Sequence, residues 1–124
     1  MANPNIVDAT SIVGKTTYDA DVSTSSTLLL VGVSNKILKI NSLIVANIDS
    51  AATPQSADIT VLIRDSGNTT TRSTLAKDIA VPAYATLVVI SKDTSIYLDE
   101  NDAIYISASV AGDLSATCSY EEIS

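Results

Sequence analysis

Residues 36–48 of this chain read KILKINSLIVANI, and apolar and polar side chains alternate along this stretch. One set of alternate positions carries the apolar residues Leu38, Ile40, Ile44, Ala46 and Ile48. The other set contains, among apolar members, the polar residues Lys39, Asn41 and Asn47. Because successive side chains of a strand point to opposite faces, this pattern predicts a strand with one buried and one wet face.

Runs of the same kind recur along the chain, about ten residues apart and separated by polar turn signals. The turn signals include residues 65–68 (DSGN) and 111–113 (AGD). Many short strands with few tight hairpins favour a sandwich with jelly-roll or related Greek-key topology. We therefore expect residues 11–124 to form one all-β domain, a single β-sandwich of about eight strands. Residues 1–10 are polar and lack the alternation, which predicts a short N-terminal arm.

The alternation also predicts which side chains fill the core. Residues 27–33 are apolar on both faces, which predicts a strand that is central in its sheet or covered on both sides. Inward positions are predicted for Leu75, Ile79, Val81, Ile104, Ile106, Ala108 and Val110. Cys118 shares its face with Leu114, Ala116 and Tyr120 and is expected to be a buried thiol. A lone cysteine forms no internal disulfide, which is compatible with a reducing cytoplasm.

The charge and hydropathy of the chain argue against nucleic acids and membranes as partners. The chain has seven basic and fourteen acidic residues, a formal net charge of −7 that repels phosphate backbones, so we expect no nucleic-acid binding. Residues 1–7 have neither the basic residues nor the apolar stretch of a signal peptide. The longest apolar runs fall far short of the roughly 20 residues that cross a bilayer, so no membrane association is expected.

Few groups in this sequence could carry catalysis or bind a metal. The chain has no His, the usual general base, and its one Cys is predicted to face inward. The densest acidic group, Asp99, Glu100 and Asp102, lies in a predicted turn and lacks the spacing of a calcium loop, which favours a solvated turn. A zinc site would need more His or Cys ligands. We therefore expect no enzymatic activity, no metal and no cofactor.

Two tyrosines are the strongest candidates for a contact surface. Tyr97 and Tyr105 lie on the predicted strands that flank the acidic turn, both at outward positions. Exposed tyrosine is common at protein contacts because it supplies area and a hydroxyl at little entropic cost. Decoration of a sheet is an equally good interpretation of this pattern. A second apolar set at Leu43, Val45 and Leu62 favours burial of another face against other subunits.

Several stretches of the chain resemble a known group of proteins. They are residues 81–90 (VPAYATLVVI), 95–104 (SIYLDENDAI) and 119–123 (SYEEI), together with residues 1–6 (MANPNI) and 39–45 (KINSLIV). They resemble the small β-sandwich virion proteins of tailed bacteriophages, especially those that infect marine cyanobacteria. Asn101 stands where that group usually has Gly in the turn, a mild departure because Asn also tolerates a positive φ.

The resemblance implies a structural protein of the virion, assembled in the host cytoplasm. The leading expectation is a capsid decoration (cement) protein that contacts the major capsid protein or other virion proteins. A homo-oligomer is expected, with a trimer as the natural unit and dimers and monomers left open. Interface positions are expected at Asn3, Pro4, Ile6, Tyr97 and Tyr105. The alternatives are a neck, tail or baseplate component, or a carbohydrate-binding module for host attachment.

Overall fold

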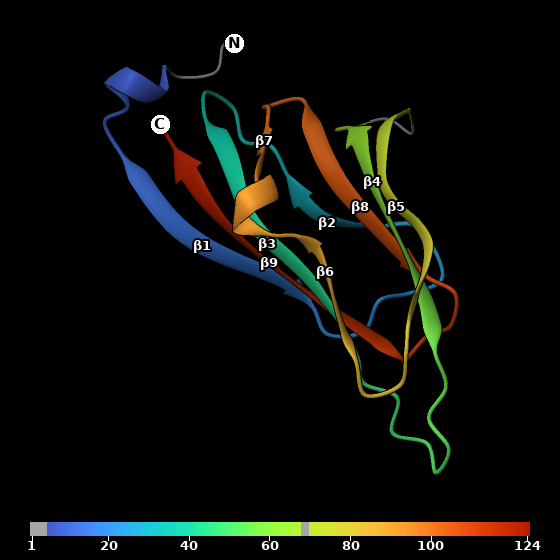
Figure 1. Ribbon diagram of the computed structural model, residues 1–124. Coiled ribbons are helices and arrows are strands. Elements are labelled where there is room, and N and C mark those ends of the chain that lie inside the picture. Colours follow the sequence, from blue (N-terminus) through green and yellow to red (C-terminus); the bar gives the residue numbers. More distant parts are fainter. Residues whose placement is uncertain (1–4, 68–69) are drawn as a thin grey trace.

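The computed structural model describes residues 5–67 and 70–124 and consists of two antiparallel sheets packed face to face (Figure 1). Sheet A contains, in spatial order, β1 (Ile12–Asp19), β9 (Leu114–Ile123), β3 (Ile37–Asn47) and β6 (Thr86–Ile90), and β7 (Ile96–Leu98) also pairs with β3. Sheet B contains β2 (Thr27–Val31), β8 (Asp102–Ala108), β4 (Ala57–Asp65) and β5 (Thr71–Val81). The described helices, η1 (Ile6–Asp8) and η2 (Lys92–Thr94), are single 3-10 turns, and neither could span a membrane. The predicted all-β sandwich is confirmed, with nine strands in the described residues.

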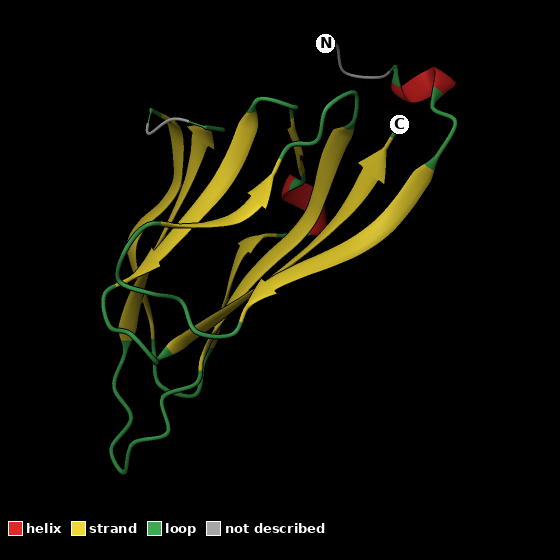
Figure 2. Cartoon of the chain, turned by 180° about the vertical axis from the view of Figure 1, so that it is seen from behind, coloured by secondary structure: helices red, strands yellow, loops and turns green. Residues whose placement is uncertain are grey.

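The strand pairs are nested around one central hairpin. β4 pairs with β5, β3 with β6, β2 with β8 and β1 with β9, so each pair encloses the previous one along the chain. A long hairpin folded over into two sheets in this way is a jelly roll. The first and last strands become neighbours, and η1 and the C-terminus therefore lie at the same end of the sandwich (Figure 1). The loop of residues 48–56 projects from the opposite end (Figure 2).

Strand β3 contains a bulge that corrects part of the predicted inward face. Ile40 lies opposite Tyr120, but Ser42 lies opposite Ser119, so Asn41 is an extra residue. An extra residue reverses the alternation, and the strand therefore buries Leu38 and Ile40 before the bulge but Leu43 and Val45 after it. The predicted inward positions of Ile44, Ala46 and Ile48 were wrong, because Ile44 and Ile48 are exposed and Ala46 is only partly buried.

The core between the sheets is filled by aliphatic side chains. The largest fully buried ones are Leu38, Ile40, Leu43, Ile59, Leu98, Ile104, Ile106 and Leu114. The predicted burial of Cys118 beside Leu114 and Ala116 is confirmed, and Tyr120 packs against this cluster. Burial raises the pKa of the Cys118 thiol to about 12, so the group stays a neutral thiol at physiological pH. Cys118 therefore acts as a small apolar side chain.

Strand β2 is an edge strand, and the prediction of a central or doubly covered strand was wrong. A register shift against β8 lies between Leu28 and Leu30. Leu29 and Leu30 are both buried, whereas Leu28 and Val31 are exposed. The run is apolar on both faces because the bulge turns two consecutive leucines inward, not because layers cover both sides.

Two other predicted core positions are exposed for local reasons. Ile79 lies opposite the buried Ile59 and so has the predicted inward side, but it is 42% exposed because β5 is an edge strand of sheet B. Val110 is exposed because β8 ends at Ala108 and the chain turns. The predicted inward positions of Ile104, Ile106 and Ala108 are confirmed.

The described part of the predicted N-terminal arm is attached to the C-terminal end. The side chain of Asn5 accepts a hydrogen bond from the Val7 amide and caps η1. The Thr10 and Ser11 amides both donate to the carbonyl oxygen of Ser124, at 2.7 and 3.0 Å. These contacts lead the chain into β1 alongside β9.

Candidate functional site

The structure separates the two tyrosines that were predicted to form a contact surface. Tyr97 lies opposite Lys39 on the outer face of sheet A, and Tyr105 lies opposite Leu62 on the outer face of sheet B. Their predicted outward orientation is confirmed, but they occupy opposite faces of the sandwich. Of the other predicted interface residues, Ile6 is exposed in η1. Asn3 and Pro4 lie outside the described residues.

An apolar row that was not predicted crosses the outer face of sheet A. The strand registers place Tyr18, Thr117, Ile44 and Val88 side by side across β1, β9, β3 and β6. Tyr18 is 73% exposed, Val88 56% and Ile44 36%. Directly opposite residues have Cβ atoms about 5 Å apart, so the four side chains form one continuous strip. We call this strip the sheet A row.

Small side chains surround the sheet A row. The neighbouring outward positions of these strands carry Thr16, Ser42, Ala46, Thr86, Ser115 and Ser119. None of these side chains rises as far above the sheet as tyrosine or isoleucine. Around the sheet A row, the outer face of sheet A is therefore shallow and made of small hydroxyl and methyl groups, with the row as its apolar ridge.

The outer face of sheet B carries a second and more polar patch. Leu28, Tyr105 and Leu62 lie opposite one another across β2, β8 and β4. The guanidinium of Arg64 lies 5.1 Å from the centre of the Tyr105 ring, a cation–π contact that holds the ring on the sheet. Tyr105 is thereby partly buried within its own chain, which leaves less of it for a partner than of Tyr18.

The acidic turn is linked to nearby groups of the same chain. Arg72 places Nε 2.8 Å from Oδ1 of Asp102 and its NH2 group 2.8 Å from Oδ1 of Asp65. The hydrogen bond with Asp65 is the main cause that raises the pKa of Arg72. The Glu100 carboxylate accepts a hydrogen bond from the Asn35 amide at 2.9 Å. Residues 5–67 and 70–124 contain no group of three or more His, Cys, Asp or Glu side chains arranged to hold a metal ion.

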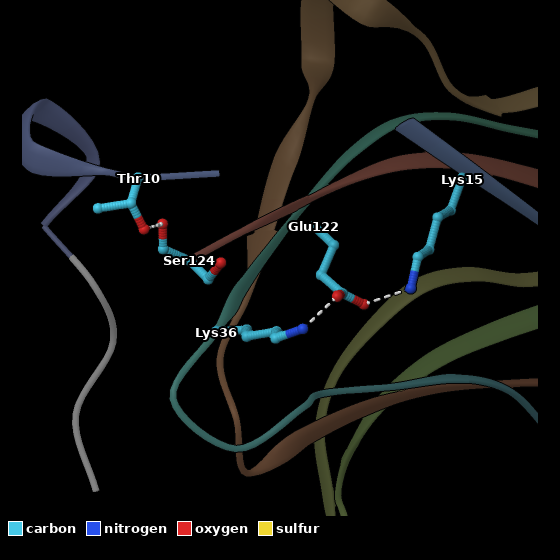
Figure 3. A network of polar contacts seen from close by, with 5 residues as sticks. All are labelled: Thr10, Lys15, Lys36, Glu122 and Ser124. Atoms are coloured by element: carbon cyan, nitrogen blue, oxygen red, sulfur yellow. Dashed lines mark hydrogen bonds and ion pairs between the residues drawn. The ribbon is translucent and has the colours of Figure 1, made fainter. Parts of the chain in front are cut away.

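A buried carboxylate joins three strands at the end of sheet A that holds Ser124 (Figure 3). Glu122 on β9 accepts hydrogen bonds from Nζ of Lys15 on β1, at 2.9 Å, and from Nζ of Lys36 just before β3, at 2.6 Å. Glu122 faces inward because it lies opposite the buried Leu38. The hydrogen bond from Lys36 is the main cause that lowers the pKa of Glu122, and the bond from Lys15 lowers it further. Glu122 in turn raises the pKa of Lys15.

The Lys15–Glu122–Lys36 cluster is a structural pair of salt bridges that share one carboxylate. Both acceptor oxygens of the carboxylate are used by lysines, which offsets the cost of burying its charge. Sequence reasoning missed the cluster because its members are 86 and 107 residues apart and fit no motif. Only the register of β1 and β3 against β9 brings them together.

Across its described part, the structure contains no detectable pocket. The exposed candidates for function are therefore the two outer faces of the sandwich and the edges of its sheets. Comparison of the whole chain with protein-family models and with curated proteins found no match.

Proposed function

We propose that this chain is a structural protein of a bacteriophage particle, a decoration protein that binds the capsid shell through the outer face of sheet A. The likeness of residues 81–90, 95–104 and 119–123 to small virion proteins of tailed phages supports the class of function. The observation that carries the choice of surface is the sheet A row, with Tyr18, Ile44 and Val88 exposed in one strip.

Binding through this face would follow from the hydrophobic effect. Removing apolar surface from water contributes about 25 cal/mol per Å², or about 1.5–3 kcal/mol for a fully buried large side chain. Tyrosine adds a hydroxyl for hydrogen bonding at the rim of a contact. Small residues on either side allow a flat partner surface to approach the backbone. A protein that bridges neighbouring shell subunits in this way adds contact area that resists separation of the subunits.

The first test is the copy number of this chain in purified particles, measured by quantitative mass spectrometry against the major shell subunit. A copy number close to that of the shell subunit is the expected result. A few copies per particle would contradict the decoration role and favour a neck, tail or baseplate position. Complete absence from particles would contradict the virion function as a whole.

The second test asks whether the sheet A row is the contact surface. Val88→Asp places a charge at one end of the sheet A row, beside Ile44, at an exposed position of an edge strand. We expect it to abolish binding to shells that lack the protein, while the melting temperature changes little. Ala52→Asp in the exposed loop adds the same charge away from the row and is the matched control. Equal binding by both variants would show that another surface is used.

A further inference from the structure

The edges of the two sheets differ in how they are protected. Apart from the three-residue β7, the described edge strands are β1, β2, β5 and β6. Register shifts interrupt the pairing of β2 with β8, of β5 with β4 and of β6 with β3. β1 instead pairs with β9 over eight consecutive residues, from Ile12 to Asp19, without a shift. Bulges are a common means of preventing strand addition, and β1 has none.

The free side of β1 presents an ordered row of backbone donors and acceptors. Ser11 and Ser124 exchange both of their backbone hydrogen bonds, at 3.0 and 2.9 Å, so they form a hydrogen-bonded pair. Such pairs alternate with non-bonded pairs along an antiparallel ladder. Odd-numbered residues of β1 therefore bond to β9, whereas Ile12, Gly14, Thr16 and Tyr18 direct N–H and C=O groups away from it. No strand of the described residues pairs with that side of β1.

Several large apolar side chains along this edge are exposed to solvent. Tyr18 is 73% exposed, Ile12 60% and Val13 46%, and together they cover both faces of β1. Charged side chains on an edge strand discourage pairing with another strand. The charged side chain of Lys15 instead bonds to Glu122 of its own chain, so the free side of β1 largely lacks this protection.

We propose that the occupant of this edge is a second copy of the same chain, paired β1 to β1 in antiparallel fashion about a twofold axis. A twofold contact requires a self-complementary surface, and β1 meets this condition when the axis passes through Thr16. Thr16 then lies opposite the partner copy's own Thr16, a favourable cross-strand pair. The Tyr18 ring lies over the partner copy's Gly14, where no side chain obstructs it, and diagonally beside its Ile12.

This register also forms backbone hydrogen bonds between the two copies, and it avoids placing their Lys15 side chains directly opposite each other. Gly14, Thr16 and Tyr18 direct their backbone N–H and C=O groups toward the partner copy. The Thr16 pair and the two Gly14–Tyr18 pairs are therefore hydrogen-bonded pairs. On the inner face, Lys15 lies opposite the partner copy's Thr17 and diagonal to both the partner copy's Asp19 and the partner copy's Lys15. An axis one residue earlier, through Lys15, would place two lysines directly opposite each other, which is unfavourable. The two copies of sheet A then form one continuous sheet across the dimer. The proposed dimer does not depend on the proposed virion function.

Proline at one position tests the strand pairing without breaking the fold. Thr16→Pro removes an N–H that points away from β9, so the pairing of β1 with β9 keeps all its bonds. Thr16→Val keeps the N–H and the β-branched shape and is the matched control. By sedimentation equilibrium, we expect the parent and Thr16→Val chains to dimerise. We expect Thr16→Pro to weaken the dimer by roughly thirtyfold, because two hydrogen bonds are lost.

Cross-linking tests the register and keeps the proposal falsifiable if Thr16→Pro fails to fold. Paired residues at the axis have Cα atoms about 5.5 Å apart, within the range of a disulfide. Under oxidation, we expect Thr16→Cys to form a covalent dimer and Thr86→Cys, exposed on the other edge of sheet A, to stay monomeric. The native Cys118 is buried and does not compete. A parent chain that is monomeric at millimolar concentration, a trimer, or a dimer that survives Thr16→Pro would overturn the proposal.

Discussion

At the scale of single residues, Gly32 is the position where the fold tolerates no side chain. Gly32 follows β2, and its amide donates to the carbonyl oxygen of Asp102 at 2.8 Å. A Cβ atom there would overlap the backbone carbonyl of Asp99 and lie 2.9 Å from Cα of Glu100. Because the obstacle is backbone, it cannot rotate away as a side chain would. We expect Gly32→Ala to lower the free energy of unfolding by about 2–4 kcal/mol, measured by urea denaturation.

Gly14 supplies the matched control within the same chain. A Cβ on Gly14 would meet nothing within 4 Å, and its backbone does not have a positive φ. For the monomer, Gly14→Ala is therefore expected to change the free energy of unfolding by less than about 1 kcal/mol, with a gain from reduced freedom of the unfolded chain. Equal stabilities of the two variants would show that the turn after β2 does not pack against residues 99 and 100.

At the scale of elements, the bulge at Asn41 decides which face of β3 enters the core. Deleting Asn41 would remove the extra residue and make Ile40 and Ser42 consecutive, so Leu43 and Val45 would keep their inward side and their partners on β9. Because these side chains stay in the core, we expect the free energy of unfolding to change by about 1 kcal/mol or less. Thermal unfolding followed by circular dichroism measures it.

Deleting Ala52 from the exposed loop of residues 48–56 is the control, since that loop lies outside both sheets and tolerates a change of length. We expect this variant to melt close to the parent. If the Asn41 deletion instead melted far below both the parent and the Ala52 deletion, the register on the two sides of the bulge would be contradicted, and so would the outward position of Ile44 in the sheet A row.

The fold class and most inward faces could be predicted from the sequence, but the bulges could not. Alternation within one strand is a local signal, and it was correct for Cys118 and for Ile104 and Ile106. A bulge is defined by the partner strand, which lies far away in the chain. For this reason the predictions for Ile44 and Ala46 were wrong although the strand itself was located correctly.

The candidate surface was predictable only in part for the same reason. Tyr97 and Tyr105 were correctly placed on outward faces, yet the chain crosses from sheet A to sheet B between them. Residues close in sequence were therefore assigned to one surface although they occupy two. The sheet A row has the opposite property, because Tyr18, Ile44 and Val88 are distant in sequence and meet only through strand pairing.

At the scale of the whole molecule, acid affects stability through two opposing effects. The chain carries a net charge of −7, and protonation of its carboxylates reduces the mutual repulsion of that excess. Glu122 has the opposite effect on stability, because Lys36 and Lys15 lower its pKa below the ordinary value of 4.5. A carboxylate whose folded pKa is depressed stabilises the fold above its unfolded pKa, and this contribution is lost as the pH falls through the folded value.

Comparison of the parent with Glu122→Gln separates the two effects, because the remaining carboxylates are the same in both chains. At neutral pH we expect the variant to be less stable by about 1 kcal/mol, a modest value because both lysines are partly exposed. Below pH 4.5 the difference should shrink, since protonation of Glu122 removes in the parent the same charge that the substitution removes. Urea denaturation across this pH range measures the difference. A gap between the two chains that stayed constant from neutral to acid pH would show that Glu122 stabilises the end of sheet A by packing, not by charge.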